Sequence, residues 1–292
     1  MTGTRRRRRR WGRWLILGPL LLVAAVALWG VLDAFGGLGS ETAWNHRWRS
    51  ADGTTIGGYL IRPAEARRFA PRPATGTTVR VEPSRDGRLP AVLLLHEWWG
   101  LRRDTLAMAE QLAADGYVVL APDALRGHVA VSVPGALVQM AVIPQEQIAA
   151  DLDSALDDLR SQSGVDPRRI AVVGFCFGGT QAMLLGTRTP DLAATGIFYG
   201  GGPITDPDAI GSLAVGGPLL GIYGSEDRTI PVEDARRLGT ILVEAGRSAE
   251  IEVYDGVGHA FVDPTSIRTP GPAASAWDRM RLFLADALVA GR

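Results

Sequence analysis

The chain has 292 residues, of which 46% are hydrophobic and 21% are charged. These proportions are typical of a globular protein and exclude a disordered chain, and the length is sufficient for one large domain with additional segments. The charges are unevenly placed, because the first 32 positions hold seven arginines and no acidic residue. The remainder has 31 − 7 = 24 basic residues against 31 acidic ones, so no nucleic-acid-binding surface is expected.

The chain has one cysteine, Cys176, and four histidines. A single cysteine excludes an intramolecular disulfide. The histidines are scattered, and no cysteine–histidine cluster has the spacing of zinc ligands. We therefore expect neither a metal nor a cofactor.

The N-terminal segment has the pattern of a membrane signal. Residues 1–13 form a basic arm with six consecutive arginines, and residues 14–32 follow as 19 residues without charge. A helix of that length covers about 28 Å, close to the hydrocarbon thickness of a bilayer. We expect a transmembrane anchor at 14–32 in the cell membrane, with the arm in the cytoplasm and the rest of the chain outside. The alternative is a signal peptide cleaved after Ala27, which would leave a secreted protein.

A Gly-rich linker is predicted at 33–43, before a domain at 44–292. The first part of that domain, Trp44–Arg62, is predicted to form a β-hairpin. The next part, Pro63–Leu89, is rich in Pro, Arg, Thr and Gly and has no apolar period. It is predicted to be a surface loop or insertion.

Strand-like and helix-like segments alternate through the remainder of the chain. Short apolar runs predict strands at 91–95, 117–121, 170–173, 194–199, 219–223 and 249–254. Amphipathic segments predict helices at 105–114, 145–160, 178–185, 232–245 and 273–289. This alternation predicts an α/β fold with a mostly parallel central sheet covered by helices on both faces. An apolar segment at 128–143 is predicted to form a small cap over a pocket.

The strand predicted at 170–173 runs directly into Gly174-Phe175-Cys176-Phe177-Gly178 and then a helix. This order is typical of a nucleophile elbow, in which flanking glycines let the backbone fold back closely. The helix N-terminus favours a thiolate. We therefore predict that Cys176 is the nucleophile and that the Phe177 N–H is one oxyanion donor. The alternative is a small buried cysteine that only packs.

An acid and a histidine follow the cysteine in the order typical of α/β-hydrolases. Asp227 comes after the strand predicted at 219–223, and His259 lies in a loop with preceding glycines. We predict that Asp227 orients His259, which acts as the general base. Glu226 is the alternative acid, and a turn-forming role is the alternative for Asp227.

The segment His96-Glu97-Trp98-Trp99 ends the strand predicted at 91–95, where the second oxyanion donor of such folds arises. We assign that donor to the Trp98 N–H. Glu97 is a carboxylate in an aromatic setting, so desolvation would raise its pKa and let it hydrogen-bond the thiol; a structural role is the alternative. The residues predicted to line the substrate pocket are Trp99, Phe175, Tyr199 and Arg126, with core packing or a solvated surface position as the alternative.

Five segments together resemble the dienelactone hydrolase family, and they occur in the family's order: HEWWGL, GYVVLAPD, GFCFGG, GSEDRTIP and GHAF. The resemblance runs from about Gly53 to the C-terminus, with poor coverage at 64–88. It implies an α/β-hydrolase fold and hydrolysis of an ester or lactone through an acyl-enzyme on Cys176, assisted by His259 and Asp227. It also implies that Glu97 helps to generate the thiolate when substrate binds.

Two positions depart from the family pattern. Well-known members have a serine directly after the catalytic histidine and an arginine three residues beyond that serine, and these bind a substrate carboxylate. This chain has Ala260 and Asp263 there. An acidic residue should repel a carboxylate, so a neutral small-molecule ester or lactone is expected as substrate. The alternatives are a non-catalytic α/β-hydrolase-like binding protein and an esterase or peptidase of another subfamily on the same fold.

Overall fold

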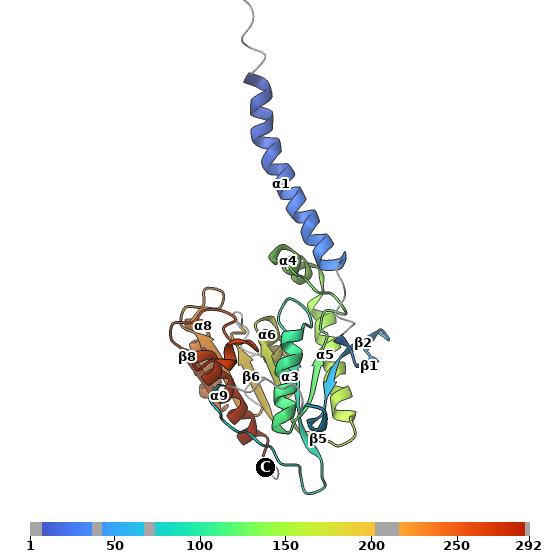
Figure 1. Ribbon diagram of the computed structural model, residues 1–292, viewed down its shortest axis with the longest axis vertical. Coiled ribbons are helices and arrows are strands. Elements are labelled where there is room, and N and C mark those ends of the chain that lie inside the picture. Colours follow the sequence, from blue (N-terminus) through green and yellow to red (C-terminus); the bar gives the residue numbers. More distant parts are fainter. Residues whose placement is uncertain (1–7, 37–42, 67–73, 202–215, 290–292) are drawn as a thin grey trace, which may run out of the picture.

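The computed structural model describes residues 8–36, 43–66, 74–201 and 216–289, with side chains from Pro19 onward. Parts of three predicted segments therefore lie outside the described residues. These parts are residues 1–7 of the basic arm, 37–42 of the linker and 67–73 of the insertion. The described chain consists of a long N-terminal helix and an α/β sheet domain from which that helix projects (Figure 1).

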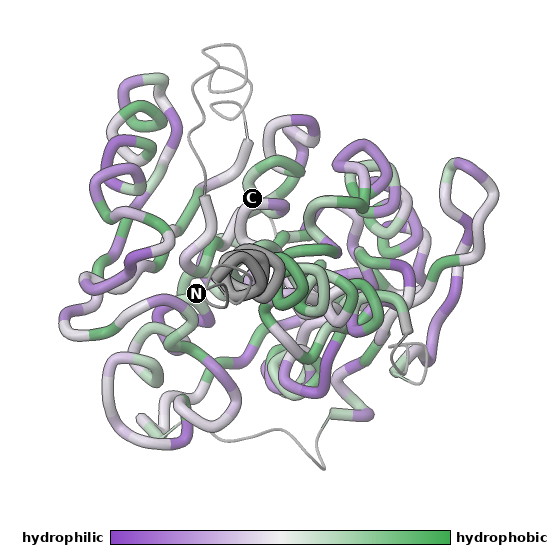
Figure 2. The backbone as a smooth tube through the Cα atoms, turned by 90° about the horizontal axis from the view of Figure 1, so that it is seen from above, coloured by the Kyte–Doolittle hydropathy of each residue, from purple (hydrophilic) through white to green (hydrophobic). Residues whose placement is uncertain are grey.

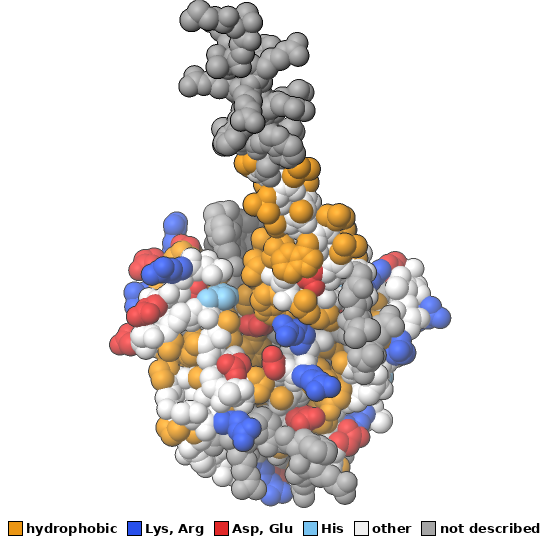
Figure 3. Space-filling model, turned by 45° about the horizontal axis from the view of Figure 1, so that its top comes forward, with side chains coloured by type: hydrophobic (Ala, Val, Ile, Leu, Met, Phe, Trp, Pro, Cys, Tyr) orange, Lys and Arg blue, Asp and Glu red, His pale blue; other side chains and the backbone are white. Residues whose placement is uncertain are grey.

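Helix α1, Arg8–Gly36, contains the apolar segment predicted as an anchor. Its residues from Leu20 to Leu32 are apolar, with Gly30 among them (Figure 2). Apart from Gly30, they are exposed (Figure 3). The helix continues past Leu32, so the linker begins later than predicted. Among the described residues no helix combines the length and the hydropathy that crossing a bilayer requires. The transmembrane part of the predicted architecture is therefore not confirmed.

The sheet has eight strands in the order β1-β2-β4-β3-β5-β6-β7-β8. Strands β1 (His46–Arg49) and β2 (Thr55–Ile61) form the predicted hairpin, and β2 pairs antiparallel with β4 (Val118–Pro122). The remaining pairs are parallel. Their strands are β3 (Leu89–Leu95), β5 (Val165–Phe175), β6 (Ala194–Phe198), β7 (Leu219–Gly224) and β8 (Ala249–Tyr254). The prediction of a mostly parallel sheet is confirmed.

Helices lie between these strands in the predicted alternation. They are α2 (Pro63–Ala66), α3 (Arg103–Asp115), α4 (Val133–Val142), α5 (Gln145–Ser161), α6 (Phe177–Arg188), α8 (Val232–Glu244), the short 3-10 helix η2 (Ser266–Arg268) and α9 (Pro272–Ala287). The segment predicted as a cap contains α4, which lies at the lower end of α1 in Figure 1.

The insertion predicted at 63–89 is only partly a surface loop. Val79 and Val81 are buried, and the Val81 N–H donates to the carbonyl of Asp115 over 2.8 Å. These two β-branched residues sit at alternate positions, so an extended backbone turns both toward the core. The prediction of a purely surface segment is wrong for this part.

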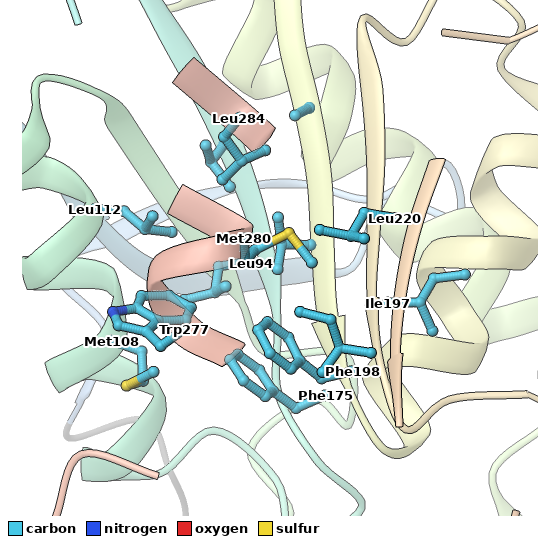
Figure 4. Close-up of a cluster of buried hydrophobic side chains, with 14 of the residues drawn as sticks. Leu94, Met108, Leu112, Phe175, Ile197, Phe198, Leu220, Trp277, Met280 and Leu284 are labelled. Carbon is cyan, nitrogen blue, oxygen red and sulfur yellow. The ribbon is translucent and has the colours of Figure 1, made fainter. Parts of the chain in front are cut away.

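Alternate residues of the central strands pack into two separate hydrophobic layers, one on each face of the sheet. In β3, Val92 and Leu94 belong to one layer, whereas Ala91, Leu93 and Leu95 belong to the other. The first layer includes side chains of α3 and α9, and the second includes side chains of α5 and α6. Figure 4 shows the first layer, where α3 and α9 meet β3, β5, β6 and β7. Both faces are thus buried, as parallel sheets require.

The carboxyl ends of parallel strands lie at one edge of a sheet, and ligands bind there in open α/β sheets. Each of the predicted site segments follows a parallel strand at this edge. The residues that follow β3, β5, β6, β7 and β8 include Glu97, Cys176, Tyr199, Asp227 and His259, respectively.

Candidate active site

Cys176 lies in the turn that joins β5 to α6. Its backbone has φ 52° and ψ −115°, a strained conformation for a residue with a side chain. The turn is held by two hydrogen bonds, from the Cys176 N–H to the Phe198 carbonyl over 2.9 Å and from the Thr180 N–H to the Cys176 carbonyl over 3.0 Å. A Cβ added at Gly174 would overlap the backbone of Gly178 across the turn, and a Cβ added at Gly178 would overlap the carbonyls of Leu95 and His96 at the end of β3. The two glycines therefore make the close approach possible, as the sequence pattern predicted.

The thiol of Cys176 is the end of a chain of hydrogen-bonding side chains. Its Sγ lies 3.0 Å from Nε2 of His259, and Nδ1 of that ring lies 2.7 Å from Oδ2 of Asp227. The other carboxylate oxygen, Oδ1, accepts the N–H groups of Thr229 over 2.7 Å and Ile230 over 2.9 Å. Asp227 is buried and both its oxygens are engaged, which holds the carboxylate toward the ring.

The neighbouring acid has a different position. Glu226 is exposed, and its backbone N–H donates to the Val257 carbonyl over 3.0 Å. The structure thus brings Asp227, and not Glu226, to His259.

Tyr199 supports the histidine from the end of β6. Its buried ring meets the His259 ring edge-on with 5.1 Å between centroids, and its hydroxyl donates to the Val262 carbonyl over 3.0 Å. Tyr199 and Ala260 have positive φ values of 38° and 55°. Together with Cys176, three residues with side chains adopt this unfavourable conformation around one site, a pattern associated with functional positions.

The proton of the Cys176 thiol is held tightly. Burial raises the pKa of this thiol to about 12, the charges of Glu97 and Asp227 act in the same direction, and the Phe177 N–H opposes them. The helix N-terminus was expected to favour a thiolate, but desolvation is the larger effect here. At neutral pH the side chain is therefore a thiol that needs a base, and His259 is within hydrogen-bonding distance.

Glu97 follows β3 and is half-buried. Burial raises its pKa, the charges of Asp104 and Asp263 act in the same direction, and His259 and Arg102 oppose them. A carboxyl group with a raised pKa keeps its proton to higher pH and can donate a hydrogen bond. Glu97 is thus placed to carry a proton close to the thiol.

The adjacent histidine, His96, has a structural position. Its buried ring is engaged at both nitrogens: Nδ1 lies 2.6 Å from the Glu97 carbonyl, and Nε2 accepts the Ala124 N–H over 3.1 Å. Burial lowers the pKa of His96. The ring is therefore neutral, with Nδ1–H as the donor, and its hydrogen bond to the Glu97 carbonyl fixes the backbone at Glu97.

The structure gives different information on the two predicted oxyanion donors. The Phe177 N–H forms a hydrogen bond with the Cys176 side chain. Trp98 lies in a tight turn closed by a hydrogen bond from the Gly100 N–H to the Glu97 carbonyl, 3.2 Å long, and its own carbonyl accepts Nε2 of Gln139 in α4 over 3.1 Å. The role of the Trp98 N–H stays a prediction.

A cavity of about 70 Å³ opens beside these groups. Three of its lining side chains are acidic, namely Glu97, Asp104 and Asp263, and within this described lining none is basic. The complete lining is Glu97, Asp104, Thr105, Met108, Phe175, Ala260, Val262, Asp263 and Pro264. Such a cavity disfavours an anionic group.

The structure places one of the four predicted pocket residues, Phe175, in this lining. Trp99 instead packs on Trp98, with ring centroids 5.2 Å apart. Arg126 does not line the cavity, because its guanidinium pairs with Asp151 over 2.7 Å and Asp52 over 2.9 Å.

Sequence reasoning missed the contribution of α3 to the cavity. Asp104, Thr105 and Met108 line it from the first turns of this helix. The signal was available, because residues three and four apart share one helix face, and α3 directly follows the Glu97 turn. From the sequence alone, however, this face of α3 could not be distinguished from a first helical turn that is exposed to solvent.

Comparisons with known proteins show which proteins this chain resembles. The family model described as the dienelactone hydrolase family matches residues 77–288. An Escherichia coli K12 protein named "Putative carboxymethylenebutenolidase" is 32% identical over 211 residues, which are 67% of this chain and 76% of the relative.

Solved structures are similar over a larger share of the chain. One from Klebsiella pneumoniae, named "Putative Dienelactone Hydrolase", is 25% identical with a TM-score of 0.63, and the match covers 81% of this chain and 96% of that one. A dienelactone hydrolase-like promiscuous phosphotriesterase from metagenomic libraries is 22% identical with a TM-score of 0.64, covering 83% and 97%. The second likeness concerns the fold alone, which is that of the α/β-hydrolases.

Proposed function

The chain belongs to the dienelactone hydrolase family and is a hydrolase of carboxylic ester or lactone bonds, and we propose that it acts through an acyl-enzyme on Cys176. One observation carries this proposal. Sγ of Cys176, the two ring nitrogens of His259 and Oδ2 of Asp227 form an unbroken hydrogen-bonded chain, with separations of 3.0 and 2.7 Å. A nucleophile, a base and a group that orients the base are the parts that covalent catalysis requires.

In the first half-reaction, Nε2 of His259 accepts the thiol proton while Sγ attacks the carbonyl carbon of the substrate. Asp227 stabilises the imidazolium that forms, because its buried carboxylate stays 2.7 Å from Nδ1. The carbonyl oxygen gains negative charge, which the N–H groups of Phe177 and Trp98 would stabilise. The C–O bond of the ester then breaks, the leaving oxygen takes the proton from His259, and a thioester remains on Cys176.

In the second half-reaction, water attacks the thioester carbon and gives a proton to Nε2 of His259. The C–S bond breaks, Sγ recovers its proton from the imidazolium, and the carboxylic acid leaves. Each proton taken by His259 is thus returned within the same half-reaction. A lactone follows the same path, except that the leaving oxygen remains part of the acyl chain, so deacylation releases a single hydroxy acid.

Glu97 has a supporting role in this proposal. Its carboxyl group has a raised pKa and its charge raises the pKa of the Cys176 thiol. When Glu97 is protonated, that repulsion is absent and thiolate formation is easier. A substrate that excludes water from the cavity would shift Glu97 further toward the protonated form, which links substrate binding to activation of the thiol.

The preferred substrate is a neutral ester or lactone. Asp263 occupies the position where a substrate-binding arginine was expected from the resemblance, and it lines the cavity together with Asp104 and Glu97. A substrate carboxylate would meet this negative charge in a partly desolvated cavity, where repulsion is stronger than in water. This observation favours a neutral acyl group over dienelactone itself.

The direct test is hydrolysis of 4-nitrophenyl acetate by the wild-type chain and by Cys176→Ala. We expect the variant to lose about 10³-fold or more in kcat/KM, because removal of a nucleophile costs losses of this size or larger. Intact-mass measurement should detect an acetylated wild-type protein and no acetylated variant. Wild-type rates in Cys176→Ala would overturn the assignment of the nucleophile. A wild-type chain that neither turns over nor acylates would instead favour a binding protein.

We also propose that the chain is held in the cell membrane by residues 14–32, with the basic arm in the cytoplasm and the catalytic domain outside. The uncharged run, the preceding arginines and the exposed apolar side chains of α1 support this proposal. Fractionation after an alkaline wash should leave the chain in the membrane, and protease added to spheroplasts should cleave the domain. A soluble mature protein that starts at Leu28 would instead identify a cleaved signal peptide.

A further inference from the structure

Helix α4 carries an apolar face that the domain leaves uncovered. Val131, just before the helix, is 76% exposed, and Leu137 in its middle is 55% exposed. Val133 and Val142 are exposed as well. The helix contains no charged residue. Monomeric soluble proteins rarely expose several large apolar side chains next to one another unless the surface binds something.

This face continues onto α1. Asp33 of α1 joins the two helices: Oδ2 accepts the backbone N–H and the hydroxyl of Ser132 over 2.9 and 2.5 Å, and Oδ1 accepts the Val131 N–H over 3.1 Å. The Ser132 hydroxyl also accepts the Gly135 N–H as the N-cap of α4. Gly30 packs against Pro134 so closely that a Cβ there would crowd it.

On both sides of this junction large apolar side chains are exposed. On α1 they include Leu28, Trp29 and Leu32, and on α4 they are Val133, Leu137 and Val142. Figure 3 shows hydrophobic side chains running from the projecting helix onto the adjoining face of the domain. We call these six residues together the α1–α4 surface.

The α1–α4 surface is attached to the mouth of the active site. The buried side chain of Gln139 in α4 donates to the Trp98 carbonyl over 3.1 Å, and the Ala130 N–H donates to the Trp99 carbonyl over 3.1 Å. Trp98 and Trp99 belong to the turn that carries Glu97. The surface and the site therefore lie at the same end of the sheet, and the turn beside the thiol is braced by α4.

We propose that the α1–α4 surface docks on a lipid bilayer, so that the active site takes neutral esters that partition into the membrane. Three observations favour lipid as the occupant. The six side chains are uncharged, the Asp33 carboxylate between the two helices is engaged by Ser132 and Val131, and the surface is continuous with the exposed apolar length of α1. The substrate part of this inference rests on the proposed esterase function, whereas the docking part does not.

The docking is tested with a fluorescent probe on the full chain in a Cys176→Ser background, where an introduced cysteine is the only thiol. Leu137→Cys and Val243→Cys are labelled with an environment-sensitive nitrobenzoxadiazole dye. Val243 lies in α8 and is 55% exposed, the same fraction as Leu137, so it is a matched control. The proteins are reconstituted into phosphatidylcholine vesicles with and without phosphatidylglycerol.

We expect the emission at position 137 to shift to the blue in vesicles of both compositions relative to detergent-free buffer, and the emission at 243 to stay unchanged. Equal emission at the two positions would overturn the proposal. A blue shift at 137 that appears without lipid and grows with protein concentration would also overturn it, because the surface would then be covered by a second copy of the chain.

The consequence for the substrate is tested with Leu137→Asp and Val243→Asp on two esters, one soluble and one long-chain ester held in the vesicles. We expect Leu137→Asp to lower turnover of the vesicle ester about tenfold, the order expected for losing the burial of one leucine, and to leave the soluble ester unchanged. Val243→Asp should change neither. Equal effects of both variants would overturn the proposal.

Failure of the proposed function would look different. It would show as Cys176→Ala retaining turnover of the soluble ester, or as no acylation of the wild type. Because the fluorescence measurement uses an inactive background, its result decides the docking in either case.

Discussion

Nε2 of His259 lies 3.0 Å from Sγ of Cys176, although 83 residues separate them in the chain. The two side chains meet because β5 and β8 are parallel strands of one sheet and end at the same edge. Burial raises the pKa of the thiol to about 12, so the thiol keeps its proton at neutral pH, and the contact places a base next to it. The proposed chemistry depends on this pair more than on any other feature of the site.

The assignment of Asp227 as the acid that orients His259 can be tested against the adjacent Glu226. Asp227→Asn should lower kcat/KM for a soluble ester on the order of 10²- to 10⁴-fold, because the amide no longer holds His259 in the tautomer that accepts the thiol proton. Glu226→Gln is the matched control, since the adjacent acid is exposed, and it should retain wild-type kinetics. The reverse order of effects would assign the role to Glu226.

The raised thiol pKa predicts an unusual alkylation profile. Because the thiolate is the reactive form and the pKa of Cys176 is about 12, the iodoacetamide rate should keep rising about tenfold per pH unit up to pH ~10. A small free thiol should level off from about pH 9. Cys176 is the only cysteine, so total label incorporation measures this one group. A plateau below about pH 8 would show that the thiolate is already stable at rest.

Glu97 should affect the rate at which iodoacetamide alkylates Cys176. Glu97→Gln removes a negative charge that raises the pKa of the thiol, so alkylation at a given alkaline pH should become faster. Turnover of the ester should be retained, because the uncharged amide resembles the protonated carboxyl group, which does not repel the thiolate. If Glu97 were only structural, both rates would fall together or stay unchanged.

The acidic cavity should select against anionic substrates. Asp263→Asn should raise kcat/KM for an ester with a carboxylate in its acyl part by about 3- to 10-fold relative to a neutral ester of the same length. Asparagine keeps an oxygen that can accept the N–H groups of Thr265 and Ser266, so the loop should be preserved. Asp191→Asn, far from the cavity and exposed, is the control. An unchanged ratio in Asp263→Asn would contradict the proposed selectivity.

Stability should depend strongly on a buried ion cluster. Arg281, with a side chain only 4% exposed, binds Asp115 over 2.6 Å and Asp278 over 2.7 Å. Arg281→Met should lower the free energy of unfolding by about 3–5 kcal/mol, because two buried carboxylates lose their partner. Arg160→Met removes more exposed pairs with Asp157 and Asp191 and should cost at most ~1 kcal/mol. Urea unfolding followed by tryptophan fluorescence measures both, and similar losses would contradict the prediction.

Local features of this protein could be predicted from its sequence. The turn around Cys176 depends on two glycines and an adjoining apolar strand, all within a few residues, and its conformation follows from backbone sterics. The alternation of strands and helices was likewise visible in the hydrophobic period. The order of cysteine, acid and histidine then indicated which residues to expect together, although it left Asp227 and Glu226 as alternatives.

Only the tertiary structure decided the contacts between distant segments. It placed Asp227 at the histidine, engaged Arg126 with two aspartates away from the cavity, and brought Asp104 of α3 to Glu97. It also joined Asp33 of α1 to the start of α4. The physical reason is that the hydrophobic period of a segment shows which of its residues face the core. Which distant residue each of them contacts depends on the order of the strands in the sheet.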